Sequence, residues 1–142
     1  MIRVVLAVAL ASALFGIAAP SAEAVDRERS TELATDELEG VTEAAERLAA
    51  TNDPVAPGHD PAATTITIDP PTATFAESGR IRLAEDELRW EPPTGPDRTV
   101  DAAVPIRVAT PTVVTDRTRL RLSFVPAEGT PVVRLRVDPG RV

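Results

Sequence analysis

Proline is distributed unevenly along the chain, and this distribution constrains the fold more than any other feature. The 142 residues include fourteen prolines, of which only Pro20 precedes residue 54. Because proline lacks a backbone N–H and disrupts the interior of a helix, a long helix is expected only before residue 54. The thirteen later prolines predict short strands and turns in the rest of the chain.

Residues 25–51 are predicted to form an acidic amphipathic helix that ends at the sequence Thr-Asn-Asp-Pro. Their apolar residues recur at intervals of four and three, which aligns them along one side of a helix. This helix-packing seam consists of Leu38, Val41, Ala45 and Leu48, with Ala34 one turn earlier. The seam either packs on the protein's own sheet or pairs with a partner helix. We favour the first interpretation because fewer than three heptads are present.

The chain opens with an apolar run that allows two interpretations. Residues 4–22 carry no charged side chain. In one interpretation, residues 1–24 are a secretory signal, with Ala22 and Ala24 as the small residues of the cleavage site and Val25 as the first residue after it. In the other, the run is retained as a helix long enough to span a membrane about 30 Å thick. We expect the retained helix, with cleavage as the alternative.

The remainder of the chain predicts a linker followed by an antiparallel β domain. Residues 52–63 contain three prolines and a glycine, together with the only histidine, His59, which is expected in a solvated loop. Short β-branched runs over residues 64–142 predict a small antiparallel sheet or sandwich. Strands are expected near residues 64–68, 72–75, 80–84, 88–91, 99–108, 118–125 and 131–137. The predicted fold class is therefore α+β.

Two hairpins dominate the predicted β domain. RIRLAEDELRW should turn at Glu85 and Asp86, and RLRLSFVPAEGTPVVRLRV at PAEGT. Apolar residues alternate with arginines in both, so one sheet face is expected in the core and the other in solvent. The candidate partner-binding face consists of Arg80, Arg82, Arg119, Arg121, Arg134 and Arg136, with Arg89 on the same face. Guanidinium groups bind carboxylates and phosphates, whereas the simpler interpretation is a solvated face partly neutralised by nearby acids.

No catalytic, cofactor-binding or metal-binding pattern is recognisable in the sequence. One histidine and no cysteine leave few routes to nucleophilic catalysis or metal binding. The net charge of −7 argues against a nucleic-acid partner, which requires a basic surface. Residues 23–50 contain nine acids and three arginines, and the chain contains no lysine. We therefore expect a non-catalytic protein without a cofactor or a metal.

Three parts of the sequence carry a resemblance to known proteins: the start MIRVVLAVALA, the acidic helix, and the terminal RLRLSFVPAEGTPVVRLRV. An apolar helix that continues into an amphipathic helix, followed by a small sheet, is similar to the layout of type IV pilin-like subunits. The whole chain resembles a small uncharacterised family of exported haloarchaeal proteins associated with pilus or secretion machinery.

The resemblance implies a non-catalytic cell-envelope protein that is a pilin-like subunit or an accessory factor. Its partners would be envelope or pilus-like subunits, and oligomers are expected to be possible. Residues 4–22 would anchor it in the membrane with the β head outside. The alternative is a cleaved, secreted β-rich module that binds an anionic ligand or a carbohydrate.

Overall fold

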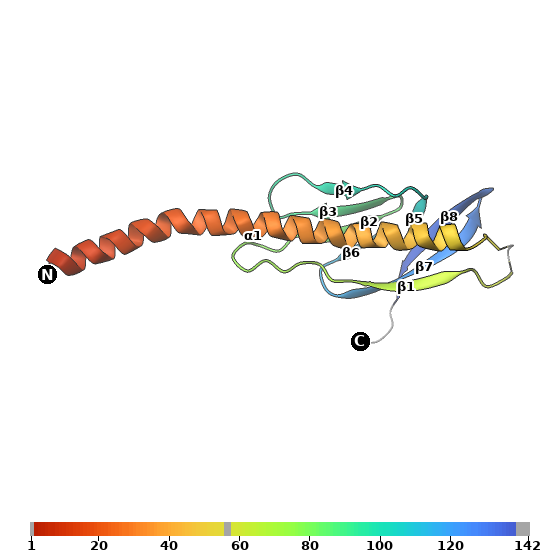
Figure 1. The fold of residues 1–142 in the computed structure, drawn as a ribbon, viewed down its shortest axis with the longest axis horizontal. Coiled ribbons are helices and arrows are strands. Elements are labelled where there is room, and N and C mark those ends of the chain that lie inside the picture. The colour runs from red at the N-terminus through yellow and green to blue at the C-terminus, as the bar shows by residue number, and fades with distance from the viewer. Residues whose placement is uncertain (1, 56–57, 139–142) are drawn as a thin grey trace.

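The computed structural model describes residues 2–55 and 58–138 (Figure 1). Residues 56–57 of the predicted linker, Met1 and residues 139–142 lie outside the described residues. The described elements are α1 (Ile2–Thr51), β1 (Ala63–Ile68), β2 (Arg80–Ala84), β3 (Glu87–Glu91), β4 (Arg98–Val100), β5 (Ile106–Val108), β6 (Thr112–Val114), β7 (Thr118–Ala127) and β8 (Thr130–Val137). The predicted α+β class is confirmed.

The strands form two sheets, which agrees with the sandwich alternative of the prediction. Sheet A has the order β1-β7-β8-β5, and sheet B has the order β4-β3-β2-β6. Every pairing is antiparallel except that of β5 with β8, which is parallel. The predicted antiparallel unit is confirmed apart from the β5 pairing, because residue alternation shows which face a side chain occupies and not the direction in which its strand runs.

Two predicted strands differ from the structure for local reasons. The run 99–108 is divided into β4 and β5, and Pro105, which has no N–H to donate, accepts from the N–H of Val133 at 2.9 Å. Residues 72–75 form no strand, because the backbone N–H groups of residues 74–76 donate to a carboxylate of α1 instead of to a neighbouring strand. The short β6 was not predicted.

Both predicted hairpins are present. In the first, β2 and β3 pair from Arg80 with Glu91 to Ala84 with Glu87, which leaves Glu85 and Asp86 in the turn as predicted. In the second, the ladder extends to the pair Ala127 and Thr130, so its turn is shorter than the predicted PAEGT loop. Both turn residues, Glu128 and Gly129, have positive φ (47° and 86°), as the twist of a two-residue hairpin requires.

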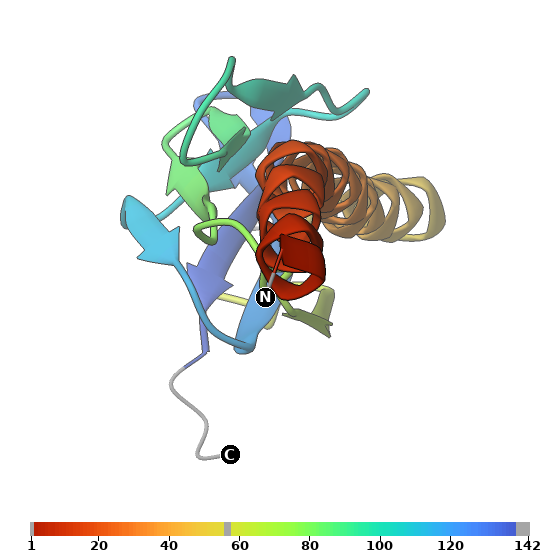
Figure 2. The same ribbon diagram turned by 90° about the vertical axis from the view of Figure 1, so that its left-hand side faces the viewer.

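The carboxy-terminal half of α1 packs across both sheets and closes the core. Figures 1 and 2 show it along one side of the strands. The seam residues Leu38, Val41 and Ala45 have no exposed surface, and Leu48 retains 7 %. They join the inward side chains of both sheets in one hydrophobic cluster. Burial of such leucine and valine side chains stabilises the fold by about 1.5–3 kcal/mol each relative to exposure.

Three acidic side chains of α1 fasten loops of the β domain to the helix. Asp26 accepts hydrogen bonds from the backbone N–H groups of residues 74–76 at 2.7, 2.7 and 3.2 Å. Glu37 accepts from the N–H of Asp69 at 3.2 Å, and Glu46 from that of Ala103 at 2.8 Å. These contacts were not predicted. They fix the position of the helix along the sheets from residue 26 onward.

Candidate functional site

The amino-terminal part of α1 is an apolar projection, which we call the projecting segment (residues 4–22). It extends beyond both sheets in Figure 1. Six large apolar side chains on it are between 61 and 69 % exposed: Val4, Val5, Leu6, Val8, Leu10 and Leu14. They lie at intervals that place them around the helix instead of on one side. A helix that is apolar on all sides is normally buried by surrounding structure.

The expected membrane anchor at residues 4–22 is corrected by the structure. Across the part of the chain that the structure describes, no helix is long and apolar enough to cross a membrane. Large apolar side chains make up less than half of the predicted run, because eleven of its nineteen residues are alanine, serine, glycine or proline. The expected location, anchored in a membrane with the β head outside, was therefore wrong.

The residues of the predicted cleavage site lie inside α1, which continues without a break from the projecting segment into the packed half. Ala24 and Val25 are exposed, and Ala22 is partly buried. One turn later, Asp26 makes the first fastening contact with the β domain. Cleavage after Ala24 stays a prediction.

The predicted arginine face is divided between two sheets. Arg80, Arg82 and Arg89 lie on sheet B, whereas Arg119, Arg121, Arg134 and Arg136 lie on sheet A. Alternation along each strand placed these side chains on solvent-facing positions, but it could not show that two separate sheets present them. The single field of seven arginines that the sequence indicates therefore does not exist.

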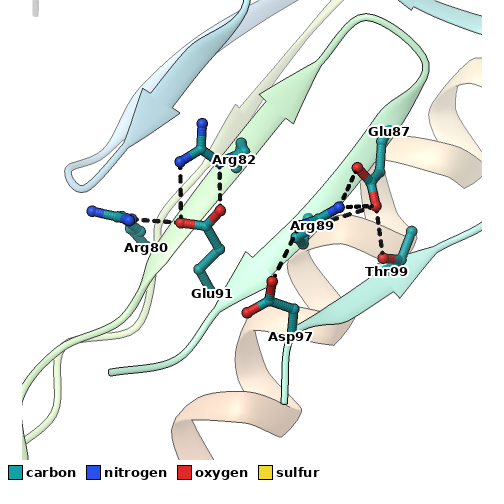
Figure 3. A network of polar contacts seen from close by, with 7 residues as sticks. All are labelled: Arg80, Arg82, Glu87, Arg89, Glu91, Asp97 and Thr99. Carbon is teal, nitrogen blue, oxygen red and sulfur yellow. Dashed lines mark hydrogen bonds and ion pairs between the residues drawn. The ribbon is translucent and has the colours of Figure 1, made fainter. Parts of the chain in front are cut away.

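On sheet B, acids of the same surface neutralise Arg80, Arg82 and Arg89 (Figure 3). Glu91 binds both Arg80, at 2.6 Å, and Arg82. Arg89 binds Glu87 at 2.6 Å and Asp97 at 3.1 Å. Arg82 and Arg89 occupy directly opposite positions, where like charges repel. The three carboxylates balance that repulsion, which makes this surface a closed network.

The carboxylates of this network have lowered pKa values. The hydrogen bonds from Arg82 and then Arg80 lower the pKa of Glu91 to about 2, and the hydrogen bond from Arg89 lowers that of Glu87. A glutamate with a lowered folded pKa stabilises the protein above its unfolded value of about 4.5, and this contribution is lost as the pH falls toward 2. The network is therefore intact at neutral pH.

On sheet A the outward arginines have fewer acidic partners than those on sheet B. We call this surface the arginine face, and it consists of Arg107, Arg119, Arg121, Arg134 and Arg136. None of the four strands of sheet A contains an acidic residue. Within the described residues, the only ion pair of this face joins Arg107 to Asp86 at 3.9 Å.

The register of sheet A brings like charges together. Arg121 lies directly opposite Arg136, and Arg107 directly opposite Arg134. Arg107 was not among the predicted residues, because its three-residue strand was read as part of a longer one. The backbone N–H of Asp138, just after β8, donates to the carbonyl of Arg119 at 2.8 Å and places one acid at the rim of the face.

A second charged surface runs along α1, and the sequence reasoning did not single it out. This acidic stripe consists of Glu28, Glu32, Asp36, Glu39 and Glu43. All five residues are exposed, and their spacing of four, four, three and four places them on one side of the helix. The same periodicity that revealed the apolar seam could have revealed the stripe on the opposite side. Glu43 makes one exposed pair with Arg47, at 4.0 Å.

The described residues form no recognisable metal site, and the larger hollows are shallow. No group of three histidine, cysteine, aspartate or glutamate residues among the described positions could hold a metal ion. His59 is exposed and isolated in its loop. The hollows of about 660 and 640 Å³ are open grooves beside α1. The candidate functional surfaces are therefore the projecting segment, the arginine face and the acidic stripe.

Comparison with known families assigns the chain to one of them. The model of a domain of unknown function, DUF7311, matches residues 1–138. The chain belongs to this family. The match includes the projecting segment together with both sheets, so the helix and the β head are parts of one family domain. No curated protein and no solved structure matches the chain.

Proposed function

We propose that the protein is a non-catalytic subunit or accessory factor of an exported assembly, such as an archaeal pilus or secretion machine. The observation that supports it is the projecting segment, whose large side chains Val4, Val5, Leu6, Val8, Leu10 and Leu14 are more than half exposed. Water-exposed apolar surface of this extent is typical of a protein interaction site. The acidic, lysine-free composition favours a haloarchaeal origin.

The partners of the projecting segment are other helices of the assembly. Its large residues alternate with Ala7, Ala9, Ala11 and Ala13, and Gly16 has open space around it. Small residues between large ones let helices approach closely. The β head would then remain at the outside of the assembly, since it is held on the other half of the same helix.

Sedimentation velocity of the full chain tests this proposal. The protein should sediment as an oligomer, and Leu10→Glu with Leu14→Glu should convert it to a monomer with an unchanged head. The matched control is Leu33→Glu, which introduces the same charge at a 44 % exposed leucine of the packed half of α1. A wild-type chain that stays monomeric at all concentrations would overturn the proposal.

The fate of residues 1–24 needs a separate measurement. Intact mass of the protein from its native cells should give a chain that retains the projecting segment. A mature protein that begins at Val25 would remove the exposed apolar residues and with them the proposed assembly contact. It would favour the second candidate function.

The second candidate is a secreted module that binds an anionic ligand or a carbohydrate. The arginine face supports it, because Arg121, Arg134 and Arg136 have no carboxylate within ion-pair distance among the described residues. For such a module, Arg119→Ala with Arg121→Ala and Arg134→Ala should abolish retention of a polyanion such as polyphosphate and preserve the fold. The assembly proposal predicts no change in the behaviour of small ligands.

A further inference from the structure

The arginine face and the acidic stripe lie on opposite sides of the β head. The apolar face of sheet A and the seam of α1 contact the same core. The arginines alternate with those inward residues, so they point away from the core, and the acidic stripe lies on the side of α1 opposite its seam. The two charged surfaces therefore cannot meet within one molecule.

Each surface carries an excess of like charges that neighbouring side chains do not neutralise. The arginine face holds two directly opposed arginine pairs, Arg121 with Arg136 and Arg107 with Arg134, and its strands supply no acid. The acidic stripe repeats like charges at neighbouring helical positions, which destabilises a helix. Sheet B shows how this chain neutralises opposed arginines when it does so internally, through Glu91, Glu87 and Asp97. The four strands of sheet A contain no acid, and the acids near its arginines are Asp86, which pairs with Arg107, and Asp138 at the rim.

We propose that the arginine face of one copy binds the acidic stripe of α1 in a neighbouring copy. The inference rests on the proposed function, and it specifies how the heads of adjacent subunits contact one another. Because the two surfaces differ, the contact is heterologous, and its repetition links subunits into a ring or an open filament. The observation that selects a second copy as the partner is the charge complementarity carried by this one chain.

The dimensions of the two surfaces agree. The strands β7, β8 and β5 are adjacent, so the face is about 10 Å wide, at roughly 4.8 Å between strands. A helix with its side chains is about 10–12 Å in diameter. The acidic stripe extends over fifteen residue steps, or about 22 Å, and offers five carboxylates to five guanidinium groups. Each guanidinium can bind a carboxylate by two parallel hydrogen bonds.

A disulfide cross-link between full-length chains tests the contact directly, because the sequence contains no cysteine. Ser123 lies on the arginine face opposite Arg134, and Asp36 lies at the centre of the stripe. A mixture of the Ser123→Cys and Asp36→Cys variants should give a mixed disulfide dimer under mild oxidation. The control replaces Asp36→Cys by Glu77→Cys, at an exposed loop position outside the stripe, and should give none.

Charge reversal provides the second test, with sedimentation of the full chain as the measurement. Arg121→Glu with Arg136→Glu should weaken association at least tenfold, as should Glu32→Arg with Glu39→Arg. Combining all four changes in one chain should restore association, because the charges are exchanged. The control is Arg29→Glu, which makes the net charge more negative at an exposed helix arginine outside both surfaces and should not weaken association. Arg47 is kept because it pairs with Glu43 of the stripe.

The outcomes separate this inference from the proposed function. If Leu10→Glu with Leu14→Glu abolishes association while reversal at the arginine face changes nothing and no mixed disulfide forms, the inference is overturned and the assembly proposal stands. If the wild-type chain is monomeric and the two cysteine variants form no mixed disulfide, both are overturned. Loss of polyphosphate binding by Arg121→Glu with Arg136→Glu, with association intact, would assign the face to a different anion and also overturn the inference.

Discussion

The half of α1 that is richer in apolar residues is the half that does not pack on the sheets: residues 4–22 contain fifteen apolar residues of nineteen, and residues 25–51 contain ten of twenty-seven. In the packed half, apolar residues follow intervals of four and three, and Leu38, Val41 and Ala45 have no exposed surface. In the projecting segment, they occur on every side of the helix, and Leu10 and Leu14 remain 64 and 62 % exposed. The packed half therefore obtains its apolar environment from its own sheets, and the projecting segment obtains none from the residues that the structure describes.

The comparison shows that periodicity, and not total hydrophobicity, decides what a helix packs on. A stripe on one side matches a single surface, which the two sheets supply through one shared core. An apolar surface on all sides requires surrounding structure. The fastening contacts of Asp26, Glu37 and Glu46 occur only in the packed half, which marks the boundary between the two. The following predictions test whether the halves are energetically independent.

The largest effect is expected from a charge in the seam. Leu38→Asp should lower the free energy of unfolding by about 3–5 kcal/mol, because it removes a buried side chain and leaves a carboxylate without a partner. Leu10→Asp, in the projecting segment, should change it by less than about 0.5 kcal/mol under monomeric conditions. Chemical denaturation followed by Trp90 fluorescence measures both. Equal effects of the two substitutions would contradict the division of α1.

An intermediate effect is expected where sheet B meets α1. The buried Trp90 donates to the Thr31 hydroxyl at 3.3 Å, and a Cβ on Gly79 would lie 2.4 Å from its ring and 2.8 Å from the carbonyl oxygen of Glu91. Gly79→Ala should therefore cost about 1–3 kcal/mol. The matched control is Gly40→Ala on α1, which meets open space and should stabilise by up to about 1 kcal/mol. A neutral Gly79→Ala would mean that Trp90 can move without disturbing the packed half.

A smaller effect, on the local stability of one loop, is expected at the boundary between the projecting segment and the packed half of α1. Hydrogen bonds from the backbone, first that of Phe75, lower the pKa of Asp26 below its usual 3.8. Its stabilising contribution is thus present above pH 3.8 and is lost as the pH falls through the lowered folded value. Asp26→Asn should accelerate hydrogen exchange at residues 74–76 and remove the acid dependence of their protection. Glu32→Gln, which changes the same charge on the exposed side of α1, should leave these amides unaffected.

The elements that were predictable from sequence have local causes. The seam and the two hairpins follow from side-chain periodicity and turn residues, and proline placement confined the helix to the first third of the chain. The unpredicted features depend on residues distant in sequence: the parallel pairing of β5 and the division of the arginines between two sheets. Alternation assigned a side chain to a face, but it could not show which strands share that face.

The smallest effect on stability is expected at Pro20, and it tests the comparison most directly. Proline in a helix interior lacks the N–H that would donate to the carbonyl of Gly16 and costs about 3 kcal/mol relative to alanine. Pro20→Ala should raise the helical signal in far-ultraviolet circular dichroism, since the projecting segment gains this hydrogen bond. If the halves are independent, the unfolding midpoint reported by Trp90 stays the same. A higher midpoint would show that α1 unfolds as one cooperative unit, in which case the projecting segment contributes to the stability of the head as well as to assembly.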